Sequence, residues 1–306
     1  MKLLWITDPW HTLDHSRDST LRLMEEGSLL GVKQDWCDVK SIRLENGKVC
    51  FEAQAWKNDN RAEHKKLSAP SDYSKIIYRT DPPVDLAYLH PLQLLALGVG
   101  KKTEMINPFS VLFSGNEKMA AASQPGLMPQ SVVSSQWEFL QAFGLKEKRT
   151  VLKPLHDAQS HGIELLDWRT AEGRENAKKV LETATQRFQT PVLLQEFLEG
   201  IHEGETRLWF LDGKLLAHAK KMPLHGDFRV NIDQGSKLVA TKLTRVEKSK
   251  IPHLTKFIRA HKIRMAAIDL IEGKVTDFNF TSPGLIRQME EVLGVNLAKP
   301  ILSRLT

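Results

Sequence analysis

Three oxygen-bearing side chains toward the end of the chain have the types and spacing of a site for a hard metal ion. Asp269 ends an apolar run, and Asp277 and Asn279 follow in a second run, one residue apart. Carboxylate and amide oxygens without thiols or paired histidines suit Mg²⁺ or Mn²⁺, and Mg²⁺ commonly uses one or two carboxylates together with substrate phosphates. The alternative interpretation is an edge hairpin with solvated acids, because short motifs also occur by chance.

Two short strands must position these side chains. Residues 272–274 between the two runs are short enough for a hairpin turn, in which the glycine would supply a positive φ. Alternate side chains of a strand point to opposite faces, so Asp277 and Asn279 are predicted to share one face, with Thr276 and Phe278 on the other. The hairpin would then bring the three oxygen ligands together on one face of a sheet.

Two lysines are placed where they could meet phosphate groups. Lys153 ends the hydrophobic strand predicted at 150–155, so it is either an edge residue that reaches solvent or a fixed positive charge for phosphates. The strand position favours the second interpretation. Lys118 is predicted at the start of a helix, because residues 114–118 have good capping chemistry.

An arginine follows another predicted strand. Residues 75–78 form an apolar run that delivers Arg79 at its carboxyl end, where open α/β sheets place their ligands. Arg79 is therefore a candidate anchor for a substrate carboxylate. The alternative is a loop arginine that pairs with Asp81 or Asp85.

The remaining pattern is that of a mixed α/β protein. A strand at 3–6 followed by a helix at 19–30 is a β-α opening, but no G-x-G-x-x-G follows the strand, so a dinucleotide site is poorly supported. Residues 36–69 have the character of a polar, irregular excursion from the first lobe, with a turn at Asn46-Gly47 between short β-like runs. The segment 192–198 is of the kind that holds an adenine ring edge-on, with an ordinary core strand as the alternative. Further elements are predicted at 131–133, 172–189, 203–210 and 214–221.

Composition argues against several classes of protein. The 306 residues exceed the usual size of one core, which predicts two or three lobes. The formal charge of +6 comes from basic residues interleaved with acidic ones, so we expect an anionic small-molecule substrate and neither a nucleic-acid nor a membrane partner. The two cysteines, Cys37 and Cys50, form no C-x-x-C, which argues against structural zinc or a disulfide framework and predicts a reducing, cytoplasmic location.

Short motifs along nearly the whole chain belong together as a set. They are Asp8-Pro9, Asp18-Ser19, Arg79 with Asp81-Pro82-Pro83, Asn116-Glu117-Lys118, Leu152-Lys153-Pro154-Leu155, Asp212-Gly213, Arg229 with Asn231, Asp269, Asp277-Phe278-Asn279, Thr281-Ser282-Pro283 and Ile286-Arg287. In these motifs the chain resembles the bacterial glutathione synthetases, which are ATP-grasp ligases. The resemblance implies an α/β protein with the ATP-grasp fold, preceded by a Rossmann-like (pre-ATP-grasp) substrate domain.

The resemblance also implies a division of the chain and a role for individual residues. The N-terminal α/β domain would span 1–116 and the ATP-grasp domain 117–306, with a lid-bearing lobe at 117–192 and a catalytic lobe at 193–306. Residues implied to bind the nucleotide are Lys118, Lys153, Gln195, Glu196, Phe197, Leu198, Glu205, Ser160 and Gly162. Residues implied to act on the phosphates and the acyl phosphate are Arg207, Arg229 and Lys221. Asp269, Asp277 and Asn279 would hold the metal, and Arg79, Asn231, Ser282 and Arg287 would lie near the peptide substrate.

The chain departs from the family pattern in its lid and at three charged positions. The family's glycine-rich lid corresponds here to residues 157–162, which contain one glycine, and side chains there restrict close backbone approach to phosphates. Glu205 stands for an aspartate, Asp277 for a glutamate and Lys221 for an arginine, and lysine does not reproduce a bidentate guanidinium contact.

Several functions remain open at this point. The first is an ATP-dependent ligase that joins γ-glutamylcysteine to glycine through an acyl phosphate, with ATP and Mg²⁺ (or Mn²⁺) as cofactors and a homo-oligomeric state expected. The second is a ligase of the same fold for another peptide or amino acid. The third is a non-catalytic nucleotide- or peptide-binding relative, against which the retained lysines and metal oxygens argue. A DNA-binding role is the remote fourth.

Overall fold

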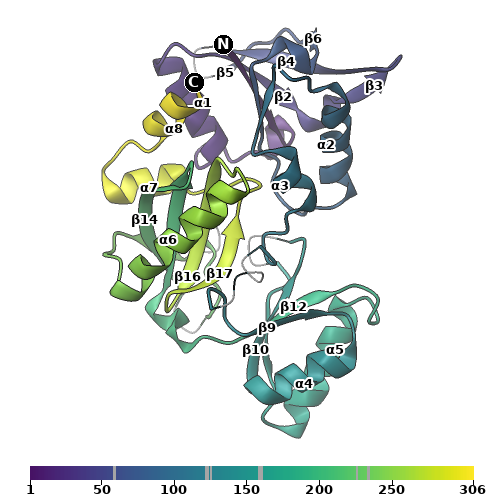
Figure 1. The fold of residues 1–306 in the computed structure, drawn as a ribbon, viewed down its shortest axis with the longest axis vertical. Coiled ribbons are helices and arrows are strands. Elements are labelled where there is room, and N and C mark those ends of the chain that lie inside the picture. The colour runs from purple at the N-terminus through teal and green to yellow at the C-terminus, as the bar shows by residue number, and fades with distance from the viewer. Residues whose placement is uncertain (58–59, 121–123, 125, 158–160, 225–226, 233–234) are drawn as a thin grey trace.

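The computed structural model describes residues 1–306 except 58–59, 121–123, 125, 158–160, 225–226 and 233–234. Within the described residues the strands form three sheets, which follow one another along the chain. Figure 1 shows the second sheet, with its two helices, at one end of an elongated molecule and the other two sheets toward the opposite end. The mixed α/β fold predicted from the sequence is confirmed.

The first sheet has a parallel centre and an antiparallel edge. Its parallel strands are β1 (Lys2–Thr7), β2 (Lys33–Asp38), β7 (Lys75–Tyr78) and β8 (Glu104–Ile106). The antiparallel strands are β3 (Arg43–Glu45), β4 (Lys48–Lys57), β5 (Asn60–Arg61) and β6 (Lys66–Ser68). The turn predicted at Asn46-Gly47 is confirmed, since it joins β3 to β4. The prediction of an irregular excursion at 36–69 was wrong, because β4 pairs with β2 and continues the sheet. Its alternating buried residues are interrupted at Gln54, which is buried, so the sequence pattern was weak.

Helices cover this sheet, and short 3₁₀ turns connect its strands. The helices are α1 (Ser19–Leu29), α2 (Leu86–Gly98) and α3 (Phe109–Ser114), and the 3₁₀ turns are η1 (Trp10–Thr12), η2 (Val39–Ser41) and η3 (Pro70–Asp72). The predicted helix opening at 114–118 was wrong, because α3 ends at Ser114 and residues 117–120 form a turn. The Asn116 side chain accepts hydrogen bonds from the backbone of Lys118 and Met119, so the capping chemistry serves this turn.

The second sheet is antiparallel and carries two helices. Its strands are β9 (Ser131–Ser134), β10 (Arg149–Pro154), β11 (Glu164–Asp167) and β12 (Val192–Glu196), and its helices are α4 (Trp137–Glu147) and α5 (Ala171–Ala184). Leu140, Leu152, Trp168 and Leu181 meet in the core between sheet and helices. Gly144 is required there, since a Cβ atom would lie 2.0 Å from the Trp168 ring.

The third sheet is antiparallel and contains the predicted hairpin. Its strands are β13 (Glu205–Leu211), β14 (Lys214–Met222), β15 (Lys237–Val239), β16 (Met265–Ile271) and β17 (Lys274–Asn279). The 3₁₀ helix η4 (Glu199–Glu203) precedes the sheet. The helices of this part are α6 (Arg245–Ala260), α7 (Ile286–Leu293) and α8 (Ala298–Leu305), of which α7 and α8 pack against α1.

The first and third sheets are joined through one buried amide and a shared core. The Asn107 side chain donates to the carbonyl oxygens of Met265 (2.8 Å) and Phe280 (2.7 Å). Its oxygen accepts from the backbone nitrogens of Arg264 (2.6 Å) and Met265 (3.0 Å). One hydrophobic cluster contains Trp5 of the first sheet and Trp209 of the third. These contacts fix the two sheets relative to each other.

The division into lobes stays a proposal. The strand β12 runs from 192 to 196 and pairs with β9 and β10, so the second sheet crosses the boundary placed after residue 192. We propose that the second lobe ends after β12. No helix among the described residues is long and apolar enough to cross a membrane.

Candidate active site

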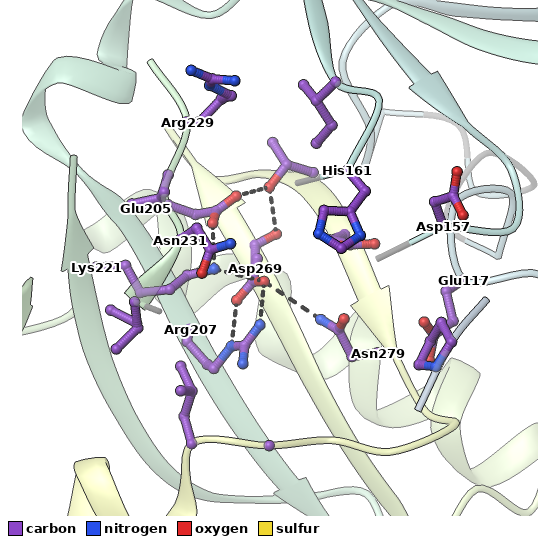
Figure 2. Close-up of a pocket in the computed structure, with 18 of the residues that line it drawn as sticks. Glu117, Asp157, His161, Glu205, Arg207, Lys221, Arg229, Asn231, Asp269 and Asn279 are labelled. Atoms are coloured by element: carbon purple, nitrogen blue, oxygen red, sulfur yellow. Dashed lines mark hydrogen bonds and ion pairs between the residues drawn. The ribbon is translucent and has the colours of Figure 1, made fainter. Parts of the chain in front are cut away.

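A cavity of about 650 Å³ lies where the three sheets meet. Side chains from all three line it, including Arg79 of the first, Lys153 of the second, and Asp269 and Asp277 of the third. Figure 2 shows that its wall carries charged groups of both signs close together. This is the place to which most of the predicted site residues converge.

The β16–β17 hairpin forms as predicted, with Glu272 at φ 53° and Gly273 at φ 74°. Asp269 lies directly opposite Asp277 in the ladder, so the two carboxylates come from adjacent strands. Asp277 and Asn279 both line the cavity, while Phe278 lies in the core, as the alternation predicts.

The predicted alternation fails at one residue. The ladder register shifts between Asp269 and Leu270, which leaves Thr276 as an extra residue on β17. Thr276 therefore lines the cavity instead of joining Phe278 in the core, and Val275 packs in the core. The Thr276 hydroxyl donates to Glu205 Oε1 at 2.6 Å. The bulge thus adds Thr276 to Asp277 and Asn279 among the polar side chains that β17 presents to the site.

Asp269 is buried and held by two cations. Its oxygens accept from Arg207 Nε at 2.8 Å and Arg207 Nη2 at 2.7 Å, and from Lys221 Nζ at 2.9 Å. Burial by itself would raise the pKa of Asp269, but the charges of Arg207 and Lys221 more than offset it and hold that pKa well below its usual value. Lys221 also lies 2.5 Å from Glu205. A lysine thus joins two carboxylates at this position.

Lys118 and Lys153 lie near the second carboxylate in different ways. Lys118 Nζ is 3.0 and 2.8 Å from the two oxygens of Asp277, whose side chain is 23% exposed. Burial would lower the pKa of Lys118, but Asp277 more than offsets this, so the pKa is raised. Lys153 instead donates to the carbonyl oxygen of Thr276 at 2.8 Å, and burial lowers its pKa to about 8.

The donor set of the hairpin fits a hard divalent cation. Two carboxylates and one amide face the cavity from adjacent strands, and the amide nitrogen of Asn279 donates to Ala267 O and Asp269 Oδ2. That geometry leaves the amide oxygen as the ligand atom of Asn279. In the described part of the chain no three His, Cys, Asp or Glu side chains gather into a metal site, so a cation bound here needs further oxygens from another molecule.

The four predicted adenine-binding residues, Gln195, Glu196, Phe197 and Leu198, all line the cavity. Glu196 accepts from the backbone of Gln130 at 3.1 Å and pairs with Lys274. The partly buried Phe197 packs against a small apolar cluster that contains Leu198. Phe197 and Leu198 thus supply apolar surface beside strand-end backbone, a combination that is suited to a purine ring.

Arg79 is buried on the side of the cavity formed by the first sheet. It donates to the Thr20 hydroxyl at 3.1 Å and to the Pro283 carbonyl at 3.1 Å. These hydrogen bonds hold the guanidinium at the cavity wall and join the first sheet to the segment after β17. The pKa of nearby Asp81 is raised to about 6, because burial outweighs the opposing effects of a hydrogen bond with Ser282 and of the Arg79 charge.

The other predicted residues divide into three groups. Arg207, Lys221, Glu205, Arg229, Asn231 and Ser282 line the cavity. Arg229 is near its mouth, since its side chain is 44% exposed and paired with Asp227. Arg287 pairs with Glu25 at 2.8 Å, and neither it nor Gly162 lines the cavity. Ser160 lies outside the described residues.

Two residues of the site were missed by the sequence reasoning. Thr276 was assigned to the core face. Glu117 was noted only as part of a motif, yet its carboxylate accepts from the backbone of Phe280 (2.6 Å) and Thr281 (2.7 Å) and from the Thr281 hydroxyl (2.8 Å). Its position directly before Lys118 was the sequence signal that could have pointed to the site. The structural role itself depends on burial, because a buried carboxylate requires several hydrogen-bond donors.

Models of two protein families match the chain. The model of the prokaryotic glutathione synthetase N-terminal domain matches residues 1–112, and the model of the prokaryotic glutathione synthetase ATP-grasp domain matches residues 117–294.

Curated proteins similar to the chain over its length are called glutathione synthetase. One from Prochlorococcus marinus is 29% identical over 310 residues, covering 100% of this chain and 98% of that protein. Another from Synechocystis sp. is 30% identical over 321 residues, covering 99% and 98%.

Solved structures of similar fold have far lower identity. The D-cycloserine synthetase DcsG aligns with a TM-score of 0.67 at 14% identity, covering 100% of both chains. The ATP-grasp ligase PsnB, complexed with minimal precursor, aligns with a TM-score of 0.66 at 15% identity, covering 99% of this chain and 97% of that chain. At this identity the likeness shows the fold alone.

Proposed function

Because the chain belongs to the prokaryotic glutathione synthetase family, we propose that it is an ATP-dependent ligase that joins γ-glutamylcysteine to glycine through an acyl phosphate. The observation that carries this proposal is the arrangement of Lys118, Lys153 and Arg207 around Asp269 and Asp277 in one cavity. Cations and metal-binding carboxylates in close proximity are what phosphoryl transfer requires, since catalysis there is mostly positioning and charge neutralisation.

The residues of the third sheet would hold the metal and the phosphates. ATP-grasp ligases use ATP with a divalent metal, and we propose Mg²⁺ or Mn²⁺ here. Asp269, Asp277 and Asn279 would ligate the cation, and bound ATP would supply the phosphoryl group. The Lys153 ammonium donates to a backbone carbonyl of β17 and, among the described residues, pairs with no carboxylate. Its positive charge is therefore suited to contact phosphate oxygens.

The residues of the first sheet would orient the peptide substrate. The buried guanidinium of Arg79 can bind a carboxylate with little loss of side-chain entropy, because Thr20 and Pro283 already fix it. Ser282 and Asn231 line the same cavity and supply neutral polar groups. Arg287 is outside this arrangement, so we assign it no contact with substrate.

A ligase for a different amine is the second candidate. His161 lines the cavity from the loop that corresponds to the family's glycine-rich lid. An imidazole occupies space and can bind an acidic or polar group, so it could select an acceptor other than glycine.

One experiment tests both candidates. The purified protein is given ATP, Mg²⁺ and γ-glutamylcysteine, and ADP release is measured with glycine and with a panel of other amines. Release that depends on glycine and exceeds that with the other amines is expected. Faster release with another amine would favour the second candidate, and no release with any amine would overturn both.

We also propose that the protein acts in the cytoplasm as a homo-oligomer. The oligomeric state is measured by light scattering coupled to size exclusion, and a monomer across micromolar concentrations would overturn that part. Fractionation of cells that produce the protein tests the location.

A further inference from the structure

The two buried lysines of the cavity face different kinds of oxygen. Lys118 places its ammonium at 3.0 and 2.8 Å from both carboxylate oxygens of Asp277. Lys153 places its ammonium at 2.8 Å from a backbone carbonyl, that of Thr276. Lys118 therefore neutralises a carboxylate that we assign to the metal, and Lys153 does not.

The other metal carboxylate is also neutralised from within the protein. Asp269 accepts from Arg207 and Lys221, and its side chain is 2% exposed. A divalent ion that arrives alone must compete with these resident charges, and the neighbouring carboxylate of Glu205 is itself already paired with Lys221. Binding of the ion is therefore weakened by cations that are already present.

A bound polyphosphate changes this competition, because its oxygens offer the resident lysine and arginine side chains a second anionic partner. Lys118 lines the cavity, so its ammonium can move from Asp277 to a phosphate oxygen without leaving the site. The carboxylate then loses its counter-ion at the moment when the phosphates supply additional oxygens to the metal. Metal and polyphosphate would each raise the affinity for the other by the same factor.

We propose that Lys118 is a specificity-determining residue, which keeps Asp277 closed to free divalent cations and releases it to a cation that arrives with a polyphosphate. The inference rests on the proposed function and deepens it, because it defines the form in which the metal is accepted. Its basis is the bidentate contact of one ammonium with one carboxylate in a buried site. Lys153, equally buried but bonded to a carbonyl, provides a matched comparison within the same cavity.

The test measures the binding of Mn²⁺ without nucleotide, by electron paramagnetic resonance of the free ion. Lys118→Met is expected to bind Mn²⁺ about tenfold or more tightly than the wild type, because removing an adjacent opposite charge changes the proton affinity of a carboxylate by about ten- to thousandfold. Lys153→Met is expected to stay within about twofold of the wild type. The double variant Lys118→Met with Asp277→Asn should lose the gain.

An unchanged or weaker Mn²⁺ affinity in Lys118→Met would overturn the inference, as would an equal gain in Lys153→Met. Circular dichroism checks that each variant is folded, and Lys118→Gln replaces the methionine variant if that fails. If neither folds, wild-type affinity for Mn²⁺ with and without ADP decides, and no increase with ADP overturns the inference. ADP release measures the proposed reaction separately. A protein without turnover can still show tighter Mn²⁺ binding by Lys118→Met, and a protein with turnover can fail to show it.

Discussion

Glu117 and Thr281 are joined by two hydrogen bonds, from the Thr281 backbone nitrogen at 2.7 Å and from its hydroxyl at 2.8 Å. Glu117 lies directly before Lys118, and Thr281 follows the strand that carries Asp277. Glu117 therefore binds a residue just after β17, and Lys118 binds Asp277 within β17, so both contacts hold the segment 117–118 against this strand. Loss of the first contact should displace the second.

We expect Glu117→Gln to destabilise the fold by about 1–3 kcal/mol, because all three hydrogen bonds end on Oε1 and a neutral amide oxygen accepts them more weakly than a carboxylate oxygen does. Urea unfolding measures the change. Thr281→Val, which removes only the hydroxyl contact, should cost about 1 kcal/mol. A Glu117→Gln variant as stable as the wild type would show that the contact adds nothing to stability.

The two candidate metal aspartates should respond differently to substitution. Asp277→Asn should stop ADP release almost completely, a loss of about a thousandfold or more, while the protein stays folded, since this side chain is partly exposed. Asp269→Asn should also lower the free energy of unfolding by about 3–5 kcal/mol, because it leaves Arg207 and Lys221 buried without their carboxylate. Near-normal ADP release by Asp277→Asn would contradict the metal assignment.

Lys153→Met should weaken ATP binding by about ten- to hundredfold, the worth of one charge-assisted hydrogen bond. Isothermal titration calorimetry checks this, with Arg287→Ala as the control outside the cavity. Unchanged ATP affinity in Lys153→Met would leave its ammonium with a structural role only.

Lys153 also predicts a pH dependence of stability. Its pKa is lowered to about 8 in the folded protein from 10.5, so the buried ammonium costs stability in full below pH 8 and the cost declines as the pH rises from 8 toward 10.5. Lys153→Met should therefore gain stability over the wild type at pH 7, and the gain should shrink above pH 8. Thermal unfolding at pH 7 and pH 9.5 measures it, and a gain that grows with pH would contradict the lowered pKa.

His161→Ala separates the two candidate substrates. If glycine is the acceptor, it is too small to contact the His161 imidazole. ADP release with glycine should then change by less than about threefold in His161→Ala, since a surface side chain that contacts no ligand has little effect. A loss of tenfold or more with glycine would place His161 at the glycine site, whereas a loss confined to another amine would favour the second candidate. The readout is kcat/KM for each amine.

The sequence predicted the hairpin of Asp269 and Asp277 well, because a glycine turn between two apolar runs is a local signal. Thr276 was misplaced since a bulge depends on the register with the partner strand, which no local pattern encodes. The pairing of Lys118 with Asp277 spans 159 positions and was likewise beyond local patterns. The helix expected at 114–118 failed because the same capping residues also stabilise turns.

The hydrogen bonds of Asn107 link the two ends of the cavity through the protein backbone. All four join the segment after β8 to residues 264–265 at the start of β16 and to residue 280 after β17, the strands that carry Asp269 and Asp277. Moving the substrate anchor Arg79 away from the metal carboxylates would require these hydrogen bonds to break, which costs free energy. We therefore expect a longer or shorter substrate to be accommodated by the side chains that line the cavity.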